Sequence, residues 1–333
     1  MSKRKLTKQQ KTRISARHDA RRERADSNNN PADKHLGPEQ EGLVISHLGK
    51  AILVEAGDGN IYRCTIRQNL GHIVCGDNVI WQATEPESGV IIAIRERRSV
   101  LTRPDFRRKP KPVVANIDQI IIVAAPEPEI SEYLIDRYLV ILASTGLSGI
   151  ILINKTDLLS ATELRELQAR LRLYQEIGYP VVFASVKQEH GLDDLVTQLR
   201  DRRSILVGQS GVGKSSLVKK LLPDLEIRIG ALNEASQGKH TTTTAVLYHL
   251  PFGGDLVDSP GVRDFGIWDV DSEKIIQGFR EFHPFLGQCR FHNCQHDSEP
   301  GCAIKAAVDE GKIDARRLQS YHRMLKDIAG ENA

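Results

Sequence analysis

The sequence predicts a multidomain protein with a small N-terminal β-barrel, a central α/β domain and a C-terminal helical segment around a metal site. Three observations predict it. Short strand-like runs punctuated by glycine fill residues 41–112, strand and helix patterns alternate over residues 113–275, and cysteines cluster within residues 276–333. A length of 333 residues agrees with several domains, because one domain takes roughly 100–200 residues.

Residues 1–40 precede these domains and are polar and basic. Residues 1–34 hold eleven Lys or Arg against four Asp or Glu, although the net charge of the whole chain is only +3. This segment has few aliphatic residues, and their burial cannot offset the entropic cost of ordering the chain. We therefore expect a disordered tail. Two interpretations stay open: a solubilising extension, or an arm that contacts nucleic-acid phosphates.

Composition also narrows the cellular context. No stretch approaches the ~18 apolar residues of a membrane span, and the N-terminus has no apolar run after its basic residues. Five cysteines in such a chain do not indicate a disulfide framework. We therefore expect a cytoplasmic protein with reduced thiols and no membrane partner, and we expect a monomer.

The first domain consists of short strands. The runs LVISHLGKAILVEA (43–56) and IYRCTIRQ (61–68) are interpreted as two strands joined by a Gly-Asp-Gly-Asn turn, and residues 72–101 give two or three more. Five short strands without a helix are typical of a barrel of the OB type, which binds oligonucleotides. Cys64 and Cys75 are predicted to be buried residues without a chemical role.

A basic strip follows the barrel. Residues 95–111 hold eight Lys or Arg and only two acidic residues. The strip is either a solvated linker or a surface that contacts phosphates, and its position beside an OB-type barrel favours the second reading.

The central domain alternates strands and helices, which predicts a parallel sheet covered on both faces. One helix is expected over residues 131–144 with Ser131 as its N-cap. A second is expected over residues 160–177, where Ser160 and Glu163 form a capping box. Further strands are predicted at 119–125, 149–153, 180–185 and 204–207.

The strand at 204–207 leads into a phosphate-binding loop with the sequence GQSGVGKSS. Its residues are Gly208, Gln209, Ser210, Gly211, Val212, Gly213, Lys214, Ser215 and Ser216. Glycines let backbone N–H groups converge on phosphate oxygens, and the following helix adds positive potential. Lys214 is expected to reach the β- and γ-phosphates, and the Ser215 hydroxyl is expected to bind Mg²⁺.

Two downstream segments complete a phosphate site. Asp258 ends an apolar strand and can hold Mg²⁺ through water, and Gly261 can donate its N–H to a γ-phosphate. In the run of threonines at 241–244, Thr242 or Thr243 is expected to close over Mg²⁺ and the γ-phosphate. Together with the loop at 208–216, these segments predict a Ras-like P-loop GTPase domain.

A separate loop predicts which base is bound. Asn154, Lys155, Thr156 and Asp157 follow a buried strand. A carboxylate at the Asp157 position can accept two hydrogen bonds from guanine, and adenine offers neither donor in that arrangement. Ala184, Ser185 and Val186 resemble the companion loop whose backbone contacts the guanine oxygen. GTP and GDP are therefore the expected ligands.

The order of these segments is unusual. The guanine loops precede the phosphate loop, whereas ordinary Ras-like GTPases have the reverse order. Joining the old chain ends and opening the chain elsewhere preserves a fold whose termini lie close together, so the order predicts a circularly permuted domain.

The residue after Gly261 is Val262, where many GTPases carry a glutamine that orients the attacking water. Valine cannot do so, and intrinsic hydrolysis should be slow and should rise with the physiological partner. His240 is a candidate for the missing role, and an ordinary loop histidine is the alternative.

The C-terminal segment contains Cys289, Cys294, His296 and Cys302 in the spacing C-x4-C-x-H-x5-C. Three thiolates and one imidazole complete the tetrahedral shell of a structural Zn²⁺ with no open position, and His292 is interpreted as a spare. The flanking helices are basic, and they either dock on RNA or are solvated.

Taken together, the barrel, NKTD, GQSGVGKSS, HTTTT, DSPGVRDFG and the cysteine cluster resemble the circularly permuted GTPases of the bacterial small ribosomal subunit, the RsgA/YjeQ type. The resemblance covers residues ~40–330. It implies a late assembly factor that binds the small subunit and its rRNA through the barrel and zinc domain, hydrolyses GTP there, and then leaves.

Two other functions are alternatives. One is a GTP-dependent RNA-binding regulator with a non-ribosomal partner, and the other is an RNA-binding zinc protein with a degenerate GTPase domain. The intact phosphate and guanine loops disfavour the second.

Overall fold

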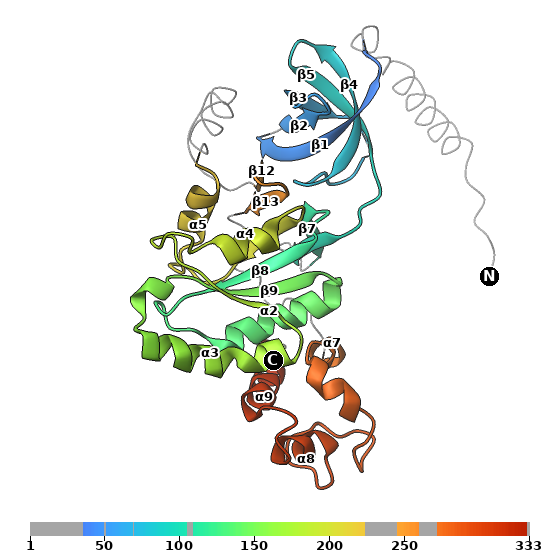
Figure 1. The fold of residues 1–333 in the computed structure, drawn as a ribbon. Helices are drawn as coiled ribbons and strands as arrows, with labels where there is room; N and C mark the ends of the chain where they lie inside the picture. The colour runs from blue at the N-terminus through green and yellow to red at the C-terminus, as the bar shows by residue number, and fades with distance from the viewer. Residues whose placement is uncertain are drawn as a thin grey trace, which may run out of the picture.

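The computed structural model describes residues 36–49, 51–68, 70–104, 109–223, 245–259 and 272–331. Figure 1 shows the barrel at one end of the molecule, the central sheet in the middle, and helices α8 and α9 beyond it. The expected basic tail lies outside the described residues, except for its last few positions.

Five strands close into the N-terminal barrel in the order β1-β2-β3-β5-β4. They are β1 (Glu39–Leu48), β2 (Ala51–Ala56), β3 (Ile61–Ile66), β4 (Asn78–Glu85) and β5 (Ser88–Ile94). This confirms the predicted five-stranded barrel. The predicted single strand over 43–56 is wrong, because a turn at Gly49, with φ 58°, divides it into β1 and β2.

Strands β6 (Val100–Pro104) and β7 (Pro110–Ala115) form an antiparallel ribbon between the barrel and the central sheet. Leu101 and Val114 of the ribbon share one hydrophobic core with residues of both neighbours. Cys75, for which a strand was expected, forms only an isolated bridge to Val114. Cys64 and Cys75 are buried as predicted, and burial raises the pKa of both thiols to about 12.

The central sheet has six strands in the order β10-β9-β8-β11-β13-β12. They are β8 (Gln119–Ala124), β9 (Ser148–Ile153), β10 (Val181–Phe183), β11 (Arg203–Val207), β12 (Val246–His249) and β13 (Asp255–Asp258). All neighbouring pairs are parallel except β12 with β13.

Helices cover both faces of this sheet, as predicted. Alternate residues of β8 and β9 point to opposite faces. One set packs with α2 (Glu132–Thr145) and α3 (Ala161–Glu176), and the other packs with α4 (Asp193–Leu199) and α5 (Lys214–Leu221). After their first residues, β8 and β9 are apolar because neither face of the sheet meets solvent there.

The predicted starts of α2 and α3 are confirmed. The Ser131 hydroxyl accepts a hydrogen bond from the backbone N–H of Leu134, so it caps α2. At α3, the Ser160 side chain accepts from the Glu163 N–H and the Glu163 carboxylate accepts from the Ser160 N–H. Both bonds of the capping box are therefore present.

The C-terminal part contains α7 (Ser272–Gln277), the 3₁₀ helix η4 (Arg280–Phe285), α8 (Ala303–Asp309) and α9 (Ala315–Glu331). Its core includes Phe279, Phe282 and Tyr321 together with Val140 of α2, so it packs directly on the central domain. No helix in the described part of the chain combines the length and apolarity that crossing a bilayer requires.

A buried ion-pair network strengthens this junction. Arg317 is only 2% exposed and contacts Asp136 of α2 at 2.5 Å and Glu281 at 2.6 Å. The guanidinium also lies 4.3 Å from the centre of the Phe279 ring. Because two carboxylates share one buried cation, α9 is held against α2 in one orientation.

Candidate functional site

The loops that follow β8, β9, β10, β11 and β13 all lie at the carboxyl edge of the sheet, because these strands run parallel. This edge is where open α/β sheets bind ligands. The predicted guanine loops and the predicted phosphate loop therefore lie along one edge, although they are far apart in sequence.

The loop after β11 requires its glycines. Gly208 has φ 136°, and a Cβ there would lie 2.1 Å from the carbonyl oxygen of Val123 in β8. Gly211 and Gly213 also have positive φ, at 85° and 94°. The loop thus lies close against the neighbouring strand and turns directly into α5, as a phosphate-binding loop must.

Lys214 begins α5 and folds back over this loop. Its ammonium group donates to the carbonyl oxygens of Gly208 at 2.6 Å and Gln209 at 2.5 Å. Ser215 and Ser216 are exposed in the first turn of the helix. One cation and two hydroxyls therefore stand at the N-terminus of α5, beside the loop.

Asn154 connects the two halves of the site. It is fully buried, and its side-chain amide donates to the carbonyl oxygen of Val212 in the loop at 2.9 Å. A Cβ at Gly213 would approach that amide nitrogen to 2.4 Å. The loop expected to read guanine and the loop expected to hold phosphate are thus in direct contact.

The neighbouring residues fix this loop to other segments. Lys155 has φ 60°, and its ammonium group donates to the carbonyl oxygen of Glu127 in the β8–α2 loop at 2.8 Å. The Thr156 hydroxyl donates to the carbonyl oxygen of Ala184 at 3.0 Å. Glu127 was missed by the sequence reasoning, because a backbone acceptor has no sequence signature.

Asp157 is held as a carboxylate. One oxygen accepts from the buried Ser185 hydroxyl at 2.6 Å, and the other lies 3.2 Å from the ammonium group of Lys187. The Ser185 hydrogen bond, followed by Lys187, lowers the pKa of Asp157 below its usual value. The group is therefore ionised at neutral pH. Lys187 was also missed, since no spacing rule identifies it.

Asp258 ends β13, which pairs with β11, the strand that leads into the phosphate loop. The other residues expected on this side are Thr242, Thr243, His240 and Gly261, with the neighbouring Val262. All five lie outside the described residues.

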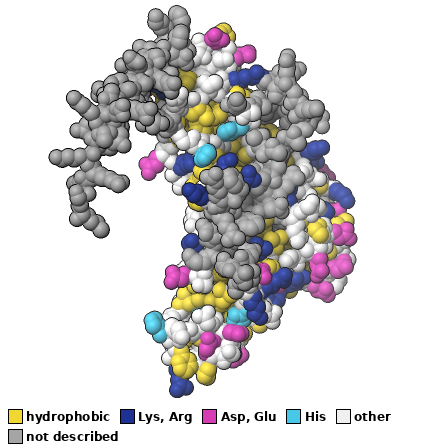
Figure 2. All heavy atoms as spheres, turned by 180° about the vertical axis from the view of Figure 1, so that it is seen from behind, with side chains coloured by type: hydrophobic (Ala, Val, Ile, Leu, Met, Phe, Trp, Pro, Cys, Tyr) yellow, Lys and Arg dark blue, Asp and Glu magenta, His cyan; other side chains and the backbone are white. Residues whose placement is uncertain are grey.

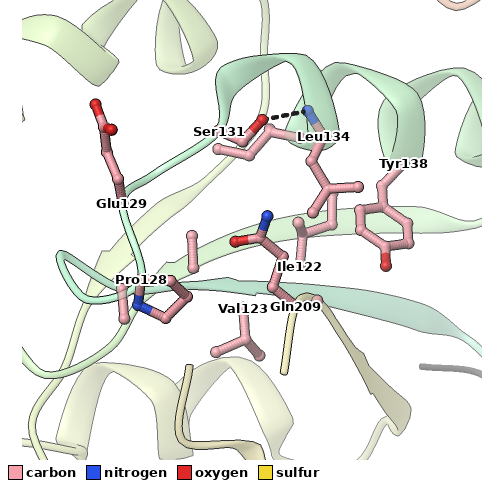
Figure 3. Close-up of a pocket in the computed structure, with 12 residues that line it drawn as sticks. Ile122, Val123, Pro128, Glu129, Ser131, Leu134, Tyr138 and Gln209 are labelled. Carbon is pink, nitrogen blue, oxygen red and sulfur yellow. Dashed lines mark hydrogen bonds between the residues drawn. The ribbon is translucent and has the colours of Figure 1, made fainter. Parts of the chain in front are cut away.

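A small pocket adjoins the start of the phosphate loop. Figure 3 shows the Gln209 side chain in it, together with Pro128, Glu129 and Ser131 from the segment before α2. The dashed line marks the hydrogen bond between Ser131 and Leu134 that caps α2. The pocket is lined in part by Gly208 and Gln209, the first two residues of the expected phosphate loop, but not by Asp157 or Lys214.

The cysteine cluster is assembled as the spacing predicted. The ligand atoms of Cys289, Cys294, His296 and Cys302 all lie within 4.8 Å of one another. Cys289 Sγ and Cys302 Sγ are 4.0 Å apart, and they lie 3.5 Å and 3.4 Å from His296 Nδ1. A tetrahedral Zn²⁺ with Zn–S of about 2.3 Å and Zn–N of about 2.0 Å fits these separations. The cluster can therefore hold a zinc ion.

Comparison with known proteins agrees with this geometry. The family model described as RsgA GTPase matches residues 94–268. The chain belongs to the RsgA GTPase family. It is 47% identical to the small ribosomal subunit biogenesis GTPase RsgA of Hahella chejuensis, over 98% of this chain and 97% of the relative. It is 50% identical to the RsgA of Chromohalobacter salexigens, over 98% and 99% of the two chains.

Solved structures show the same architecture as this RsgA-family chain. YjeQ from Thermotoga maritima has a TM-score of 0.73 at 34% identity and covers 88% of this chain and 99% of its own. YloQ, described as a circularly permuted GTPase, has a TM-score of 0.70 at 29% identity, with 90% and 96% covered. The predicted fold, a barrel followed by a permuted P-loop GTPase domain and a cysteine-rich segment, is thus confirmed.

Proposed function

We propose that this protein hydrolyses GTP to GDP and phosphate while bound to the small ribosomal subunit, and that hydrolysis is coupled to late maturation of the subunit and to its own release. One observation carries the proposal. Buried Asn154 joins the carboxylate-bearing loop of Asp157 to the glycine loop of Lys214, so one guanine nucleotide can contact both.

In this proposal Asp157 accepts hydrogen bonds from guanine, since its carboxylate is ionised and already oriented by Ser185 and Lys187. Thr156 and the segment Ala184–Val186 shape the rest of the base pocket. An adenine nucleotide would leave the Asp157 carboxylate without its donors, which disfavours its binding.

At the other end, Lys214 would exchange its contacts with the loop carbonyls for the β- and γ-phosphates, and backbone N–H groups of residues 208–216 would surround them. Ser215 and Asp258 would hold Mg²⁺, which supplies positive charge to the phosphate oxygens. We further propose Thr242 or Thr243 as the residue that closes over the γ-phosphate, Gly261 as a γ-phosphate donor, and His240 as a candidate to orient the water.

The cysteine cluster is proposed to hold one structural zinc ion, because four protein ligands leave no position for a substrate. Its core includes Val140 of α2, so the metal would stabilise the helical segment that packs on the GTPase domain. We propose the domain limits 41–112, 113–275 and 276–333, after a basic tail over 1–40.

The ribosomal partner rests on the names of the relatives, which are small ribosomal subunit biogenesis GTPases. We propose that this chain acts likewise in the cytoplasm, as a monomer, with the small subunit and its rRNA as partners. Because position 262 is valine, intrinsic hydrolysis should be slow and the subunit should accelerate it.

The test measures phosphate release from GTP with and without purified small subunits, with large subunits as the control. We expect strong stimulation by small subunits only. Equal rates with and without them would contradict the ribosomal part of the proposal, and no hydrolysis under any condition would contradict the enzymatic part.

A further inference from the structure

A cleft of about 280 Å³ lies where the barrel, the β6–β7 ribbon and the β12–β13 hairpin meet. None of the described residues that line it is acidic, and four of them carry basic or imidazole side chains, namely His47, His72, Arg103 and Lys111. Figure 2 shows histidine and Lys or Arg side chains close together on the face below the barrel.

Within the described part of the basic strip, five cations fall into two groups. Three of its arginines are already neutralised, in the pairs Arg95–Glu41 at 2.6 Å, Arg97–Asp77 at 2.7 Å and Arg98–Asp118 at 3.1 Å. Arg103 and Lys111 are exposed and form no ion pair within the described ranges. Both of them line the cleft.

These two cations also face each other. Arg103 and Lys111 are direct partners in the antiparallel register of β6 and β7. Like charges directly opposite across a strand pair repel and destabilise it. An anion between them converts the repulsion into two favourable contacts, so the pair is arranged for a negatively charged ligand.

Uncharged hydrogen-bonding groups complete the cleft. The Nε2 atom of His47 is shielded from solvent and has no hydrogen-bond partner. Burial lowers the pKa of His47, so the ring is neutral at neutral pH, and a hydrogen bond with the backbone of Ile73 engages the ring. Ser259, only 5% exposed, directly follows Asp258 of the proposed Mg²⁺ site.

We propose that this cleft binds a backbone phosphate of RNA through Arg103 and Lys111, with the Ser259 hydroxyl as a hydrogen-bonding group. The inference rests on the proposed function, because the ribosomal partner supplies the RNA. Because Arg103 and Lys111 are exposed at the surface, the phosphates of a long RNA chain can reach them. The position of Ser259 places this RNA contact one residue from Asp258, so it would report the presence of the subunit to the GTPase site.

The test uses the full chain and a short fluorescein-labelled oligouridine, with binding followed by fluorescence anisotropy over a series of KCl concentrations. The variant R103Q/K111Q is compared with R165Q/R172Q, which removes the same charge from the exposed face of α3. We expect R103Q/K111Q to bind RNA about tenfold more weakly, with a salt slope smaller by about 1. Affinity equal to the wild type in R103Q/K111Q would overturn the proposal.

A charge-preserving exchange and a free anion separate the remaining explanations. The variant R103K/K111R keeps both cations and should retain RNA affinity within about threefold, since Lys and Arg both neutralise phosphate. Calorimetry with inorganic phosphate tests a free-anion site. Phosphate binding that is lost in R103Q/K111Q, while RNA affinity is unchanged, would overturn the assignment to RNA.

GTP hydrolysis distinguishes this inference from the proposed function. The variant R103Q/K111Q should keep the intrinsic rate and lose at least about tenfold of the stimulation by small subunits. If subunits fail to stimulate the wild type, the proposed function fails, whereas the RNA titration still decides whether the cleft binds phosphate.

Discussion

Asn154 shows how much of the site depends on a single buried side chain. Its amide donates to the Val212 carbonyl, and this contact leaves no room for any side chain at Gly213. The backbone of the loop at 208–216 is therefore constrained by its contact with the loop at 154–157. Two predictions at the scale of single residues follow from this contact and from its neighbour Asp157.

Replacement of Asp157 by alanine should abolish the preference for guanine. The substitution removes a charged acceptor and leaves the guanine donors unpaired, so GTP affinity should fall about 100-fold while ATP affinity stays unchanged. Titration with fluorescent nucleotides measures both. Glu166→Ala on α3 removes an exposed carboxylate and should change neither affinity. A preserved GTP-to-ATP ratio in Asp157→Ala would refute the assignment.

Replacement of Gly213 by alanine should disrupt the link between the two loops. The new Cβ would meet Asn154 Nδ2 at 2.4 Å in a backbone with φ 94°. GTP affinity should fall at least about tenfold, because a loop displaced by even 1 Å loses its phosphate contacts. Gly59→Ala is the matched control, since Gly59 also has positive φ (83°) and a Cβ there meets nothing within 4 Å. Equal nucleotide affinity in the two variants would argue against the contact.

At the scale of elements, the β12–β13 hairpin joins the barrel to the GTPase sheet. The Ser46 hydroxyl of β1 donates to the carbonyl oxygen of Ala245 at 3.0 Å. The His249 ring contacts Glu55 of β2 at 2.6 Å and Asp255 of β13 at 2.7 Å. In sequence, the hairpin lies between Thr242 and Thr243 on one side and Gly261 on the other, and these residues are expected to contact the γ-phosphate. The barrel therefore contacts the segment that connects them.

This contact makes a prediction about pH. Hydrogen bonds to Asp255 and then Glu55 raise the pKa of His249 from 6.5 to about 9. Because folding raises this pKa, protonated His249 stabilises the folded state. This contribution is complete below pH 6.5 and is lost as the pH rises through about 9. The ring is 45% exposed, so solvent screening reduces its worth to about 1 kcal/mol.

Urea unfolding of the wild type and His249→Gln at pH 6.5 and at pH 9.5 measures this contribution, since glutamine does not titrate. The wild type should lose about 1 kcal/mol more than the variant across this interval, because other groups titrate alike in both proteins. The same loss in both would show that His249 does not clamp the barrel.

At the scale of the whole molecule, the barrel, the central sheet and the C-terminal segment are coupled in series. The barrel shares apolar contacts with the GTPase sheet through Ile45 and Leu53, and the C-terminal segment shares Val140 of α2. The buried Arg317 pairs add a polar constraint at the second junction. Loss of the cysteine cluster should therefore lower the stability of the neighbouring central domain as well.

Metal removal tests this coupling. A strong chelator should release one zinc ion per chain, measured with a chromogenic indicator, and should lower the melting temperature of the full chain. Cys294→Ser should reduce the zinc content and the melting temperature in the same way. Cys64→Ala alters a buried barrel cysteine and should keep one zinc per chain. A chain purified without zinc and unaffected by chelators would contradict a structural metal.

Much of the fold was open to prediction, because local rules governed it. The Ser160–Glu163 capping box and the glycine loop have fixed spacings that follow from helix and turn geometry. Strand limits in the barrel were less predictable. The turn at Gly49 divides the run at 43–56 into two strands. Because apolar residues occur both before and after this turn, the hydrophobic pattern alone could not show where the turn lies.

The sequence by itself determined the expected site residues and their permuted order, since the glycines, Asp157, Lys214 and the four residues of the cysteine cluster carry their chemistry in their type and spacing. Only the tertiary structure decided which partners these residues have. Lys187 beside Asp157, Glu127 beside Lys155, and Arg103 opposite Lys111 are contacts between segments, and their positions depend on strand register and packing rather than on neighbours in sequence. The basic strip shows the reason most clearly: its charges are visible in the sequence, but which of them remain available depends on carboxylates that folding brings from elsewhere in the chain.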